Sequence, residues 1–455
     1  MDRRITIIGG GLAGSEAAFQ LAVRGWAVTL LEMRPEVAGP AHHTGDLAEL
    51  VCSNSFKSCD PNTAAGMLKR ELESMGSLIL AAARASSVPA GGALAVDRTR
   101  FSALVAGTLA SLPGLTIART EAVTIPEGPV IVATGPLTSP ALEPELTRLV
   151  GEGRLAFYDA AAPVIDAATI DRDLVFAQSR YDKGAGADYL NCPLDREQYE
   201  AFIDALLAAR RVTAKEFESA DLFQACQPVE EIARKGRDAL RFGTMKPVGL
   251  TDPVTGARPW AVVQLRAENL ASTAYNLVGF QTNLTFTEQQ RVFRMIPGLG
   301  DADFLRYGVM HRNTFVDAPR LLTSDLALRE HPSVRFAGQL TGTEGYMEAA
   351  ASGLVAALGA CAQASGSDAV VVPPETALGA LLTYATGPLT SPYQPMHVNF
   401  GLVPPLAARV RGKQERYAAY AERGTAALAT WVASRGDLEL DIAVAAAERV
   451  RELTP

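Results

Sequence analysis

Apolar and polar positions in the first 32 residues follow an order that predicts a strand, a helix and a second strand. Arg4 to Ile8 is a short apolar run typical of a β-strand, and Leu12 to Val23 has the pattern of a helix. Ala27 to Glu32 is a second strand-like run, and glycines separate the first strand from the helix. Together these stretches predict one βαβ unit.

The same alternation fades in the middle of the chain and returns near its end. Thr63 to Ala83 predicts one helix, and Gly128 to Thr134 predicts an apolar strand. Beyond residue 156, aromatic, charged, proline and glycine residues mix without the βαβ rhythm. Val334 to Ala337 then predicts a strand, followed by a glycine turn and a helix over Glu348 to Ala364.

A glycine-rich turn joins the first predicted strand to the first predicted helix. Gly9-Gly10-Gly11-Leu12-Ala13-Gly14 supplies the G-x-G-x-x-G pattern, whose glycines let the backbone approach a pyrophosphate at the N-terminus of a helix. Glu32 ends the second strand, where an acid accepts hydrogen bonds from ribose hydroxyls. We therefore predict a dinucleotide site formed by Gly9, Gly10, Gly11, Leu12, Ala13, Gly14 and Glu32.

This motif does not by itself distinguish NAD from FAD. The stretches Glu16-Ala17-Ala18, Glu32-Met33-Arg34 and Val132-Ala133-Thr134-Gly135 resemble flavoproteins of the glutathione-reductase type. Val334 to Gln339, followed by Glu348 to Gly353, resembles the second flavin segment of that group. The resemblance implies bound FAD, with further contacts from Gly135, Gly338, Gly345 and Tyr346.

We predict an α/β fold, with a Rossmann-like FAD-binding domain of glutathione-reductase type that is interrupted by a mixed α+β insertion domain. The expected segments are 1–155 and 326–370 for the FAD-binding domain, 156–325 for the insertion domain on the substrate side, and 371–455 for a mostly helical C-terminal part. The octapeptide ATGPLTSP occurs at 133–140 and again at 385–392, without similarity on either side. It predicts the same turn used twice.

Composition excludes some classes of protein. Apolar residues make up 48% and charged residues 20%, which permits a large buried core. The net charge of −8 argues against non-specific nucleic-acid binding, although it is compatible with a local basic face. The five cysteines form no CxxC pair and match no metal or disulfide spacing, which indicates reduced thiols in a cytoplasmic protein without a metal. Ala349 to Gly366 is rich in alanine and glycine and predicts a packed helix, so no membrane segment is expected.

Two cysteines have cationic surroundings. Cys52 lies close to Lys57, and Cys226 precedes a basic run from Arg234 to Lys246. A nearby cation or a helix N-terminus lowers the pKa of a thiol and makes it reactive, while plain burial is the alternative for both cysteines. The first basic run, and a second run from Arg409 to Arg416, are either phosphate contacts or solvated faces.

Longer motifs extend over nearly the whole chain: GGGLAGSEAA, LEMRP, CSNSF, ACQPVEEIA, LRFGTMKPVGL, YNLVGFQTNL, FAGQLTGTEGYMEAAASG and QPMHVNFGLVPP. In this combination the chain resembles the folate- and FAD-dependent tRNA (uracil-C5)-methyltransferases, the TrmFO family, from Arg4 to about Pro405. The related GidA (MnmG) enzymes, which modify the wobble uridine, share the glycine fingerprint. They are longer, and they differ at CSNSF.

The resemblance implies methyl transfer to C5 of the T-loop uridine (uridine-54) of tRNA, with methylenetetrahydrofolate as carbon donor and with FAD, reduced by NADPH or NADH, as reductant. By the same resemblance, Cys226 matches the nucleophile whose thiolate adds to uracil C6 and makes C5 reactive. Cys52 matches a second thiol close to the flavin, and the division of roles between the two cysteines stays open. Tyr346 is either part of a platform for the folate pterin or a structural tyrosine.

Three other functions remain as alternatives. The first is a GidA-like modification of the wobble uridine. The second is a small-molecule NAD(P)H-flavin oxidoreductase, although the sequence has no redox CxxC. The third is a flavoprotein that binds RNA without chemistry. We expect a cytoplasmic protein with tRNA and folate as partners and no membrane; the sequence leaves the oligomeric state open.

Overall fold

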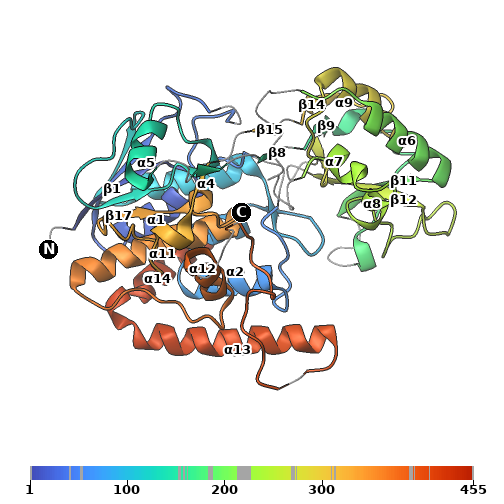
Figure 1. The fold of residues 1–455 in the computed structure, drawn as a ribbon. Coiled ribbons are helices and arrows are strands. Elements are labelled where there is room, and N and C mark those ends of the chain that lie inside the picture. The colour runs from blue at the N-terminus through green and yellow to red at the C-terminus, as the bar shows by residue number, and fades with distance from the viewer. Residues whose placement is uncertain are drawn as a thin grey trace.

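The computed structural model describes most of the chain: residues 3–39, 42–51, 55–151, 155–156, 159–160, 162–182, 188–212, 227–267, 272, 274–308, 310–311, 314–388, 393, 395–408 and 410–452. The chain forms two bodies, shown on the two sides of Figure 1, each with its own β-sheet and its own hydrophobic core.

The first body is built on a five-stranded parallel sheet. Its strands are β1 (Arg4–Ile8), β2 (Ala27–Glu32), β5 (Leu115–Arg119), β6 (Val130–Val132) and β17 (Val334–Phe336), in the order β17-β6-β1-β2-β5. Ile7 of β1 lies opposite Leu30 on one side and Ile131 on the other, and all three side chains are fully buried. Apolar runs of this kind suit a parallel sheet whose two faces are both covered.

Two helices pack tightly against each other on this sheet: α1 (Leu12–Ala22), which follows β1, and α11 (Tyr346–Ser365), which follows β17. At their contact a Cβ on Gly353 would lie 2.1 Å from the carbonyl oxygen of Ala13, so only glycine permits the approach. By length and composition alone α11 is apolar enough to cross a membrane, but 78% of its most apolar window is buried inside the protein. Its apolar surface therefore belongs to the core.

The second body contains a six-stranded antiparallel sheet in the order β10-β11-β12-β13-β9-β14. These strands are β9 (Val164–Asp166), β10 (Phe176–Ala177), β11 (Tyr189–Leu194), β12 (Ala261–Ala267), β13 (Ala274–Leu277) and β14 (Phe304–Arg306). The helices of this body are α6 (Arg196–Ala208), α7 (Val229–Arg234), α8 (Ala239–Phe242) and α9 (Phe286–Phe293). Between the bodies the chain crosses in short antiparallel pairs: β7 (Leu155–Ala156) with β16 (Phe315–Val316), and β8 (Asp159–Ala160) with β15 (Met310–His311).

C-terminal helices complete the first body. Helices α12 (Ala377–Thr386) and α13 (Lys413–Ser434) contact α2 (Ala64–Ser74), and α14 (Leu440–Arg451) contacts α3 (Leu78–Ala85). The remaining elements are β3 (Ser87–Val88), β4 (Ala95–Val96), α4 (Arg98–Ser111), α5 (Glu143–Val150) and α10 (Ala318–Leu321). The predicted α/β class with helices at the C-terminus is confirmed, while the domain boundaries drawn from the sequence stay a prediction.

One predicted element was wrong. Thr63 to Ala83 is not a single helix, because the chain breaks at Gly76, whose φ is 71°. A new helix, α3, then starts behind Ser77, whose hydroxyl accepts a hydrogen bond from the backbone N–H of Leu80. The buried carboxylate of Glu16 in α1 also accepts hydrogen bonds from the first N–H groups of α3. This cap comes from a distant segment, so local periodicity did not reveal the break.

A second buried carboxylate, Glu71 in α2, holds the start of α12. Its two oxygens accept hydrogen bonds from the backbone N–H groups of Ala377 (2.7 Å) and Leu378 (2.8 Å), and its side chain is almost fully buried. Burial raises the pKa of Glu71 to about 7, and the two backbone hydrogen bonds oppose that rise only in part.

We predict that Glu71 makes stability depend on pH near neutrality. A raised pKa means that the folded state keeps a proton that the unfolded state releases above about 4.5. The group's contribution to stability is therefore present at low pH and is lost as the pH rises through about 7. Glutamine cannot titrate, so the advantage of the wild type over Glu71→Gln in free energy of unfolding should shrink between about pH 5 and pH 8. Denaturant titrations at several pH values measure it.

Glu73→Gln is the matched control, because Glu73 lies on the same helix in partly exposed ion pairs with Arg84 and Arg451. The difference in free energy of unfolding between Glu73→Gln and the wild type should stay nearly constant over the same pH range. If the stability advantage of the wild type over Glu71→Gln is constant or grows with pH, Glu71 does not have a raised pKa.

Candidate functional site

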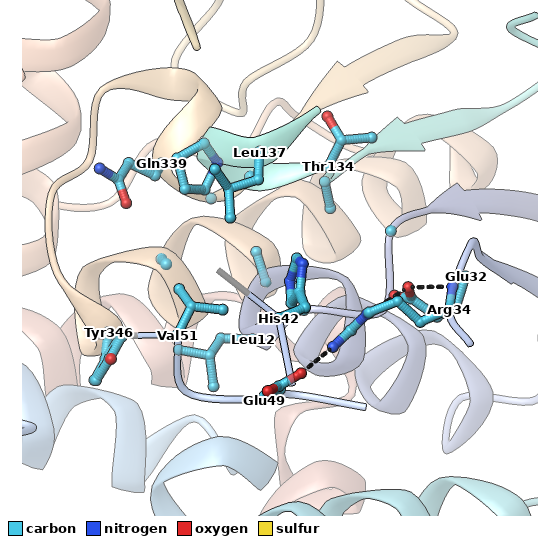
Figure 2. A pocket seen from close by; sticks show the side chains of 18 of the residues that line it. Leu12, Glu32, Arg34, His42, Glu49, Val51, Thr134, Leu137, Gln339 and Tyr346 are labelled. Carbon is cyan, nitrogen blue, oxygen red and sulfur yellow. Dashed lines mark hydrogen bonds and ion pairs between the residues drawn. The ribbon is translucent and has the colours of Figure 1, made fainter. Parts of the chain in front are cut away.

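A cavity of about 520 Å³ opens at the carboxyl ends of strands in the parallel sheet (Figure 2). Its wall includes Ile8 at the end of β1 and Gly9 after it, Leu31 and Glu32 at the end of β2, Ala133 to Pro136 after β6, and Gly338 and Gln339 after β17. Arg266 and Val278 of the second body also line it. Ligands of open α/β sheets bind at this edge, so the cavity is the candidate site.

The glycine turn between β1 and α1 fits against its neighbours without room for side chains. Gly9 has a φ of 103°, and a Cβ there would lie 2.5 Å from the carbonyl oxygen of Ala133. A Cβ on Gly14 would lie 1.8 Å from the carbonyl oxygen of Gly9. These two glycines are therefore required by packing within the protein.

Gly11 differs, because a Cβ built there would meet no atom within 4 Å and would point into space at the cavity wall. Gly11 is also the N-cap residue of α1 and makes no side-chain cap, and the first turn of α1 contains no acid. The first N–H groups of a helix lack partners within that helix and carry partial positive charge. The turn thus offers an open cradle that fits the pyrophosphate of a dinucleotide.

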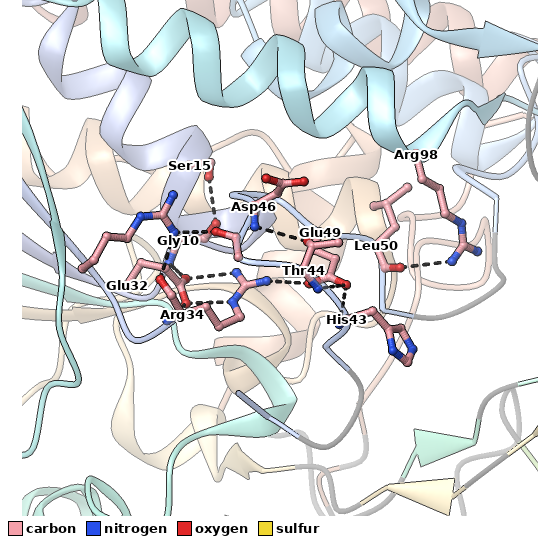
Figure 3. A network of polar contacts seen from close by, with 12 residues as sticks. Gly10, Ser15, Glu32, Arg34, His43, Thr44, Asp46, Glu49, Leu50 and Arg98 are labelled. Atoms are coloured by element: carbon pink, nitrogen blue, oxygen red, sulfur yellow. Dashed lines mark hydrogen bonds and ion pairs between the residues drawn. The ribbon is translucent and has the colours of Figure 1, made fainter. Parts of the chain in front are cut away.

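An ion-pair network orients the acid at the end of β2 (Figure 3). One Glu32 oxygen accepts the backbone N–H of Gly10 at 2.8 Å, and the guanidinium of Arg34 donates to both oxygens. Arg34 also pairs with Glu49 at 2.8 Å. Burial would raise the pKa of Glu32, but the hydrogen bonds and charge of Arg34 keep it below its ordinary value. Glu32 is therefore an ionised acceptor at the cavity wall.

His42 lines the cavity near this network, and burial together with the charge of Arg34 lowers its pKa to about 4. The imidazole is therefore neutral at pH 7, and its buried Nδ1 has no hydrogen-bond partner within the described residues. The adjacent His43 does not make this a metal site. In the described part of the chain, no group of three or more His, Cys, Asp or Glu side chains could hold a metal ion.

At the other end of the cavity, Gly345 begins α11 with a φ of 124° and no side-chain cap. Glu348, in the first turn of this helix, is buried and pairs with Lys57 at 2.6 Å. The same carboxylate oxygen accepts the backbone N–H of Val398 at 3.2 Å. Lys57, a candidate for activating Cys52, therefore has a carboxylate partner. Tyr346 lines the cavity beside Gly345, and its ring centre lies 5.3 Å from that of Phe56.

The cofactor residues predicted from the sequence fall into two groups. Those at the cavity wall are Gly9, Gly11, Leu12, Ala13, Glu32, Gly135, Gly338, Gly345 and Tyr346. Gly10 and Gly14 lie behind the wall: Gly10 donates to Glu32, and Gly14 packs on Gly9. Their roles in binding stay a prediction.

Both candidate thiols, Cys52 and Cys226, lie outside the described residues, as does Arg409 of the second basic run. Val51 and Ser55, which flank residues 52–54, both line the cavity. The chain on either side of Cys52 is thus at the site.

The segment of residues 213–226, which ends with Cys226, also lies outside the described part of the chain, but described residues before and after it contact one stretch of the second body. The backbone N–H of Val212 donates to the carbonyl of Asn283 at 2.9 Å. Beyond the segment, the backbone N–H of Val229 donates to the carbonyl of Gln281 at 2.7 Å. Residues 281–283 therefore bind the described chain on both sides of the segment.

Glu230 strengthens this attachment. Its fully buried carboxylate accepts the backbone N–H of Asn283 at 2.7 Å and the hydroxyl of Thr282 at 2.9 Å, and burial raises its pKa. Val278, four residues before Thr282, is part of the cavity wall. The stretch that binds the chain on both sides of the Cys226 segment is thus only a few residues away in sequence from the cavity wall.

The first basic run is largely occupied by contacts within the protein. Arg237 forms ion pairs with Glu200 and Asp204 of α6. The guanidinium of Arg241 lies 3.8 Å from the ring centre of Trp260. Such contacts favour a structural role for these two arginines, and contact of this run with nucleic acid stays a prediction.

Sequence reasoning did not single out Arg34, His42, Glu49 or Glu348 as residues of the site. Arg34, His42 and Glu49 lie in the loop that follows β2, and the sequence of this loop has no regular hydrophobic periodicity. The partner of Glu348 is 291 positions away in the chain. No local signal marks such pairs, and only the closely spaced Glu32 and Arg34 offered a hint.

The chain matches the model of the glucose inhibited division protein A family over residues 4–368. A methylenetetrahydrofolate--tRNA-(uracil-5-)-methyltransferase TrmFO from Moorella thermoacetica is 54% identical over 435 residues, which cover 95% of this chain and 99% of that protein. A protein of the same name from Bacillus pumilus is 51% identical over 430 residues, covering 94% and 99%.

Solved structures of GidA from Aquifex aeolicus resemble the fold. The form II crystal gives a TM-score of 0.68 at 18% identity and covers 96% of this chain and 75% of that chain. The form I crystal gives the same TM-score at 17% identity, with 96% and 77% covered. At this identity the likeness concerns the fold alone, and it agrees with the α/β arrangement.

We predict that a substitution of Gly11 abolishes cofactor binding without affecting folding, whereas a substitution of Gly14 lowers the stability of the fold. Gly11→Val should fold, because its backbone is extended (φ −71°, ψ −167°) and its Cβ meets open space, but its side chain fills the cradle. This variant should purify without FAD, with a melting temperature equal to that of flavin-free wild type. Gly14→Ala should instead lower the melting temperature, because of the clash with Gly9. Flavin absorbance per protein and thermal melts measure both; full flavin occupancy in Gly11→Val would refute the site.

Proposed function

The chain belongs to the TrmFO family of methylenetetrahydrofolate–tRNA-(uracil-5-)-methyltransferases, and from this membership we propose how its cavity serves the reaction. It is an enzyme that methylates uracil in tRNA at C5, with methylenetetrahydrofolate as the carbon donor. The observation that carries this conclusion is 54% identity over 95% of the chain. As the finer proposal, the target is the T-loop uridine, and the enzyme works in the cytoplasm on tRNA as its partner.

The cavity of the first body binds FAD in this proposal. When bound, FAD supplies the reducing electrons, taken from NADPH or NADH, that turn the transferred one-carbon unit into a methyl group. The N-terminus of α1 and the open side of Gly11 hold the pyrophosphate. Glu32, kept ionised and oriented by Arg34, accepts hydrogen bonds from ribose hydroxyls. Gly338, Gly345 and Tyr346 line the opposite end, where they contact the flavin in this proposal, and Tyr346 is also placed to form part of a platform for the folate pterin.

The second body presents the nucleophile in this proposal. The thiolate of Cys226 forms a bond to C6 of uracil, and the electron pair of the C5–C6 double bond moves to give an enolate that is nucleophilic at C5. C5 then attacks the methylene carbon of the folate, whose bonds to the folate nitrogens break with the electron pairs staying on nitrogen, and C5 loses its proton. A hydride equivalent, which reduced FAD would supply when bound, converts the CH2 group into the methyl group as the thiolate leaves C6. The contact of Val229, three residues after Cys226, with Gln281, three residues after Val278 of the cavity wall, supports this role.

The GidA-like alternative, modification of the wobble uridine, has less support. The chain covers 99% of the Moorella TrmFO but 75% of the Aquifex GidA chain. The sequence identity to that GidA chain is 18%, which shows a similarity of the fold alone. No specific observation favours a small-molecule oxidoreductase.

The proposed function predicts activity with folate as the carbon source. Purified protein incubated with an unmodified tRNA transcript, NADPH and methylenetetrahydrofolate labelled in its one-carbon unit should transfer the label to C5 of one T-loop uridine, located by nuclease digestion and mass spectrometry. S-Adenosylmethionine in place of the folate serves as the control and should give no product. Labelling at the wobble position, or methylation with S-adenosylmethionine alone, would overturn the proposal.

We predict that Cys226→Ala abolishes methylation while the flavin spectrum and NADPH oxidation stay nearly unchanged, because the flavin half-reaction needs no covalent bond to uracil. A tRNA with 5-fluorouridine at the target should trap a covalent adduct with the wild type and none with this variant, since fluorine does not leave C5 as a proton does. Gel shift under denaturing conditions measures the adduct.

Cys52→Ala is the comparison variant, because Cys52 is the other thiol that the resemblance implies at the site. If Cys226 were only packing, its loss would create a cavity and lower the melting temperature, with turnover per folded molecule unchanged. If Cys226→Ala still methylates and Cys52→Ala does not, the nucleophile is Cys52.

A further inference from the structure

Three aromatic rings form a parallel stack on the second body. The ring centres of Phe286 and Tyr307 are 4.7 Å apart, with 18° between the planes, and those of Tyr307 and Phe304 are 5.4 Å apart at 11°. Phe286 is 53% exposed. A single exposed phenylalanine is ordinary, but here its ring is the open end of a stack.

Helix α9 makes this stack rigid. Phe286 is its first residue, and the fully buried Gln289 fixes the turn at Gly308 by donating to its carbonyl (2.7 Å) and accepting from its N–H (2.8 Å). Gln290 of the same helix hydrogen-bonds the hydroxyl of Tyr307. These hydrogen bonds hold Tyr307 against the helix whose first residue is Phe286.

The stack lies beside the attachment of the Cys226 segment. Gln281 and Asn283 bind the described residues on either side of that segment, Val229 and Val212, and Phe286 follows three residues after Asn283. The backbone N–H of Thr285 donates to the backbone carbonyl of Arg210 at 3.0 Å, so Arg210 is bound to the residue that precedes Phe286. The Arg210 side chain is 77% exposed and its contact with Glu288 is long, at 3.4 Å.

We propose that Phe286, backed by Tyr307 and Phe304, is a stacking platform for an unpaired base of the tRNA substrate. This proposal rests on the proposed function, and it adds a binding site to it. A base that must react has to leave its stack, and a flat aromatic face replaces the lost stacking for any base. Arg210 supplies positive charge for the adjoining phosphate.

The test uses the full-length flavin-bound enzyme and an unmodified tRNA transcript carrying a fluorophore. Phe286→Leu keeps an apolar side chain but removes the ring, and it should weaken tRNA binding about tenfold, within the range for one base–aromatic stack. Phe286→Tyr should bind within about twofold of wild type, because a tyrosine ring also stacks on a base. Fluorescence anisotropy measures the dissociation constants.

Salt separates stacking from charge. The loss in Phe286→Leu should be the same at about 50 and 200 mM salt, since stacking releases no counterions, whereas Arg210→Gln should reduce the salt dependence itself. Leu174→Ala is the control, because Leu174 is an about equally exposed apolar residue (52%) of the same body and is not in this stack. It should bind like wild type. Melting temperature and flavin absorbance should be equal in all variants.

Wild-type affinity in Phe286→Leu, or an equal loss in Leu174→Ala, overturns the platform while leaving the proposed function intact, provided that wild type methylates the transcript. Absence of methylation by wild type is the separate failure of the proposed function. A loss in Phe286→Leu that disappears at high salt also overturns the platform, because it would show an ionic contact.

Discussion

The close backbone contact around the glycine turn is the constraint on which the first body depends. Gly9 lies against the carbonyl of Ala133, Gly14 against Gly9, and Gly353 against Ala13. These contacts bring β1, β6, α1 and α11 together at distances that any side chain would prevent. Because the backbones meet so closely, the N-terminus of α1 faces the cavity at the edge of the sheet rather than a packed layer of side chains.

Buried carboxylates hold the elements around this core. Glu16 accepts the first N–H groups of α3, Glu71 those of α12, and Glu230 the N–H of Asn283. In each case a backbone donor that burial has removed from water receives an acceptor from a distant segment. Burial raises the pKa of all three carboxyl groups, so these contacts are formed against a desolvation cost. Glu32 differs, because Arg34 compensates its charge and keeps its pKa low.

The sequence determined those parts of the fold and site that depend on neighbouring residues. The βαβ unit was predicted with β1 and β2 at their observed bounds, because hydrophobic periodicity and a glycine turn are local properties. Local periodicity also predicted α11, over Glu348 to Ala364 within its observed bounds of Tyr346–Ser365, and the strand end predicted Glu32 at the site, where it lines the cavity wall. Motifs spread along the chain identified the family, but they did not show how Cys52 and Cys226 are arranged, and both stay outside the described residues.

Only the tertiary structure decided what depends on distant neighbours. The repeated octapeptide was predicted to form one turn twice. In its first copy Gly135 (φ 64°) begins a short 3-10 helix, whereas in the second copy Thr386 ends α12 and Gly387 has a φ of −75°, so the prediction was wrong in the described part. The ion pair of Lys57 with Glu348 likewise joins residues far apart in sequence. A short segment encodes its own preferences for dihedral angles and burial, but packing selects among them, and contacts between distant side chains exist only once the chain is folded.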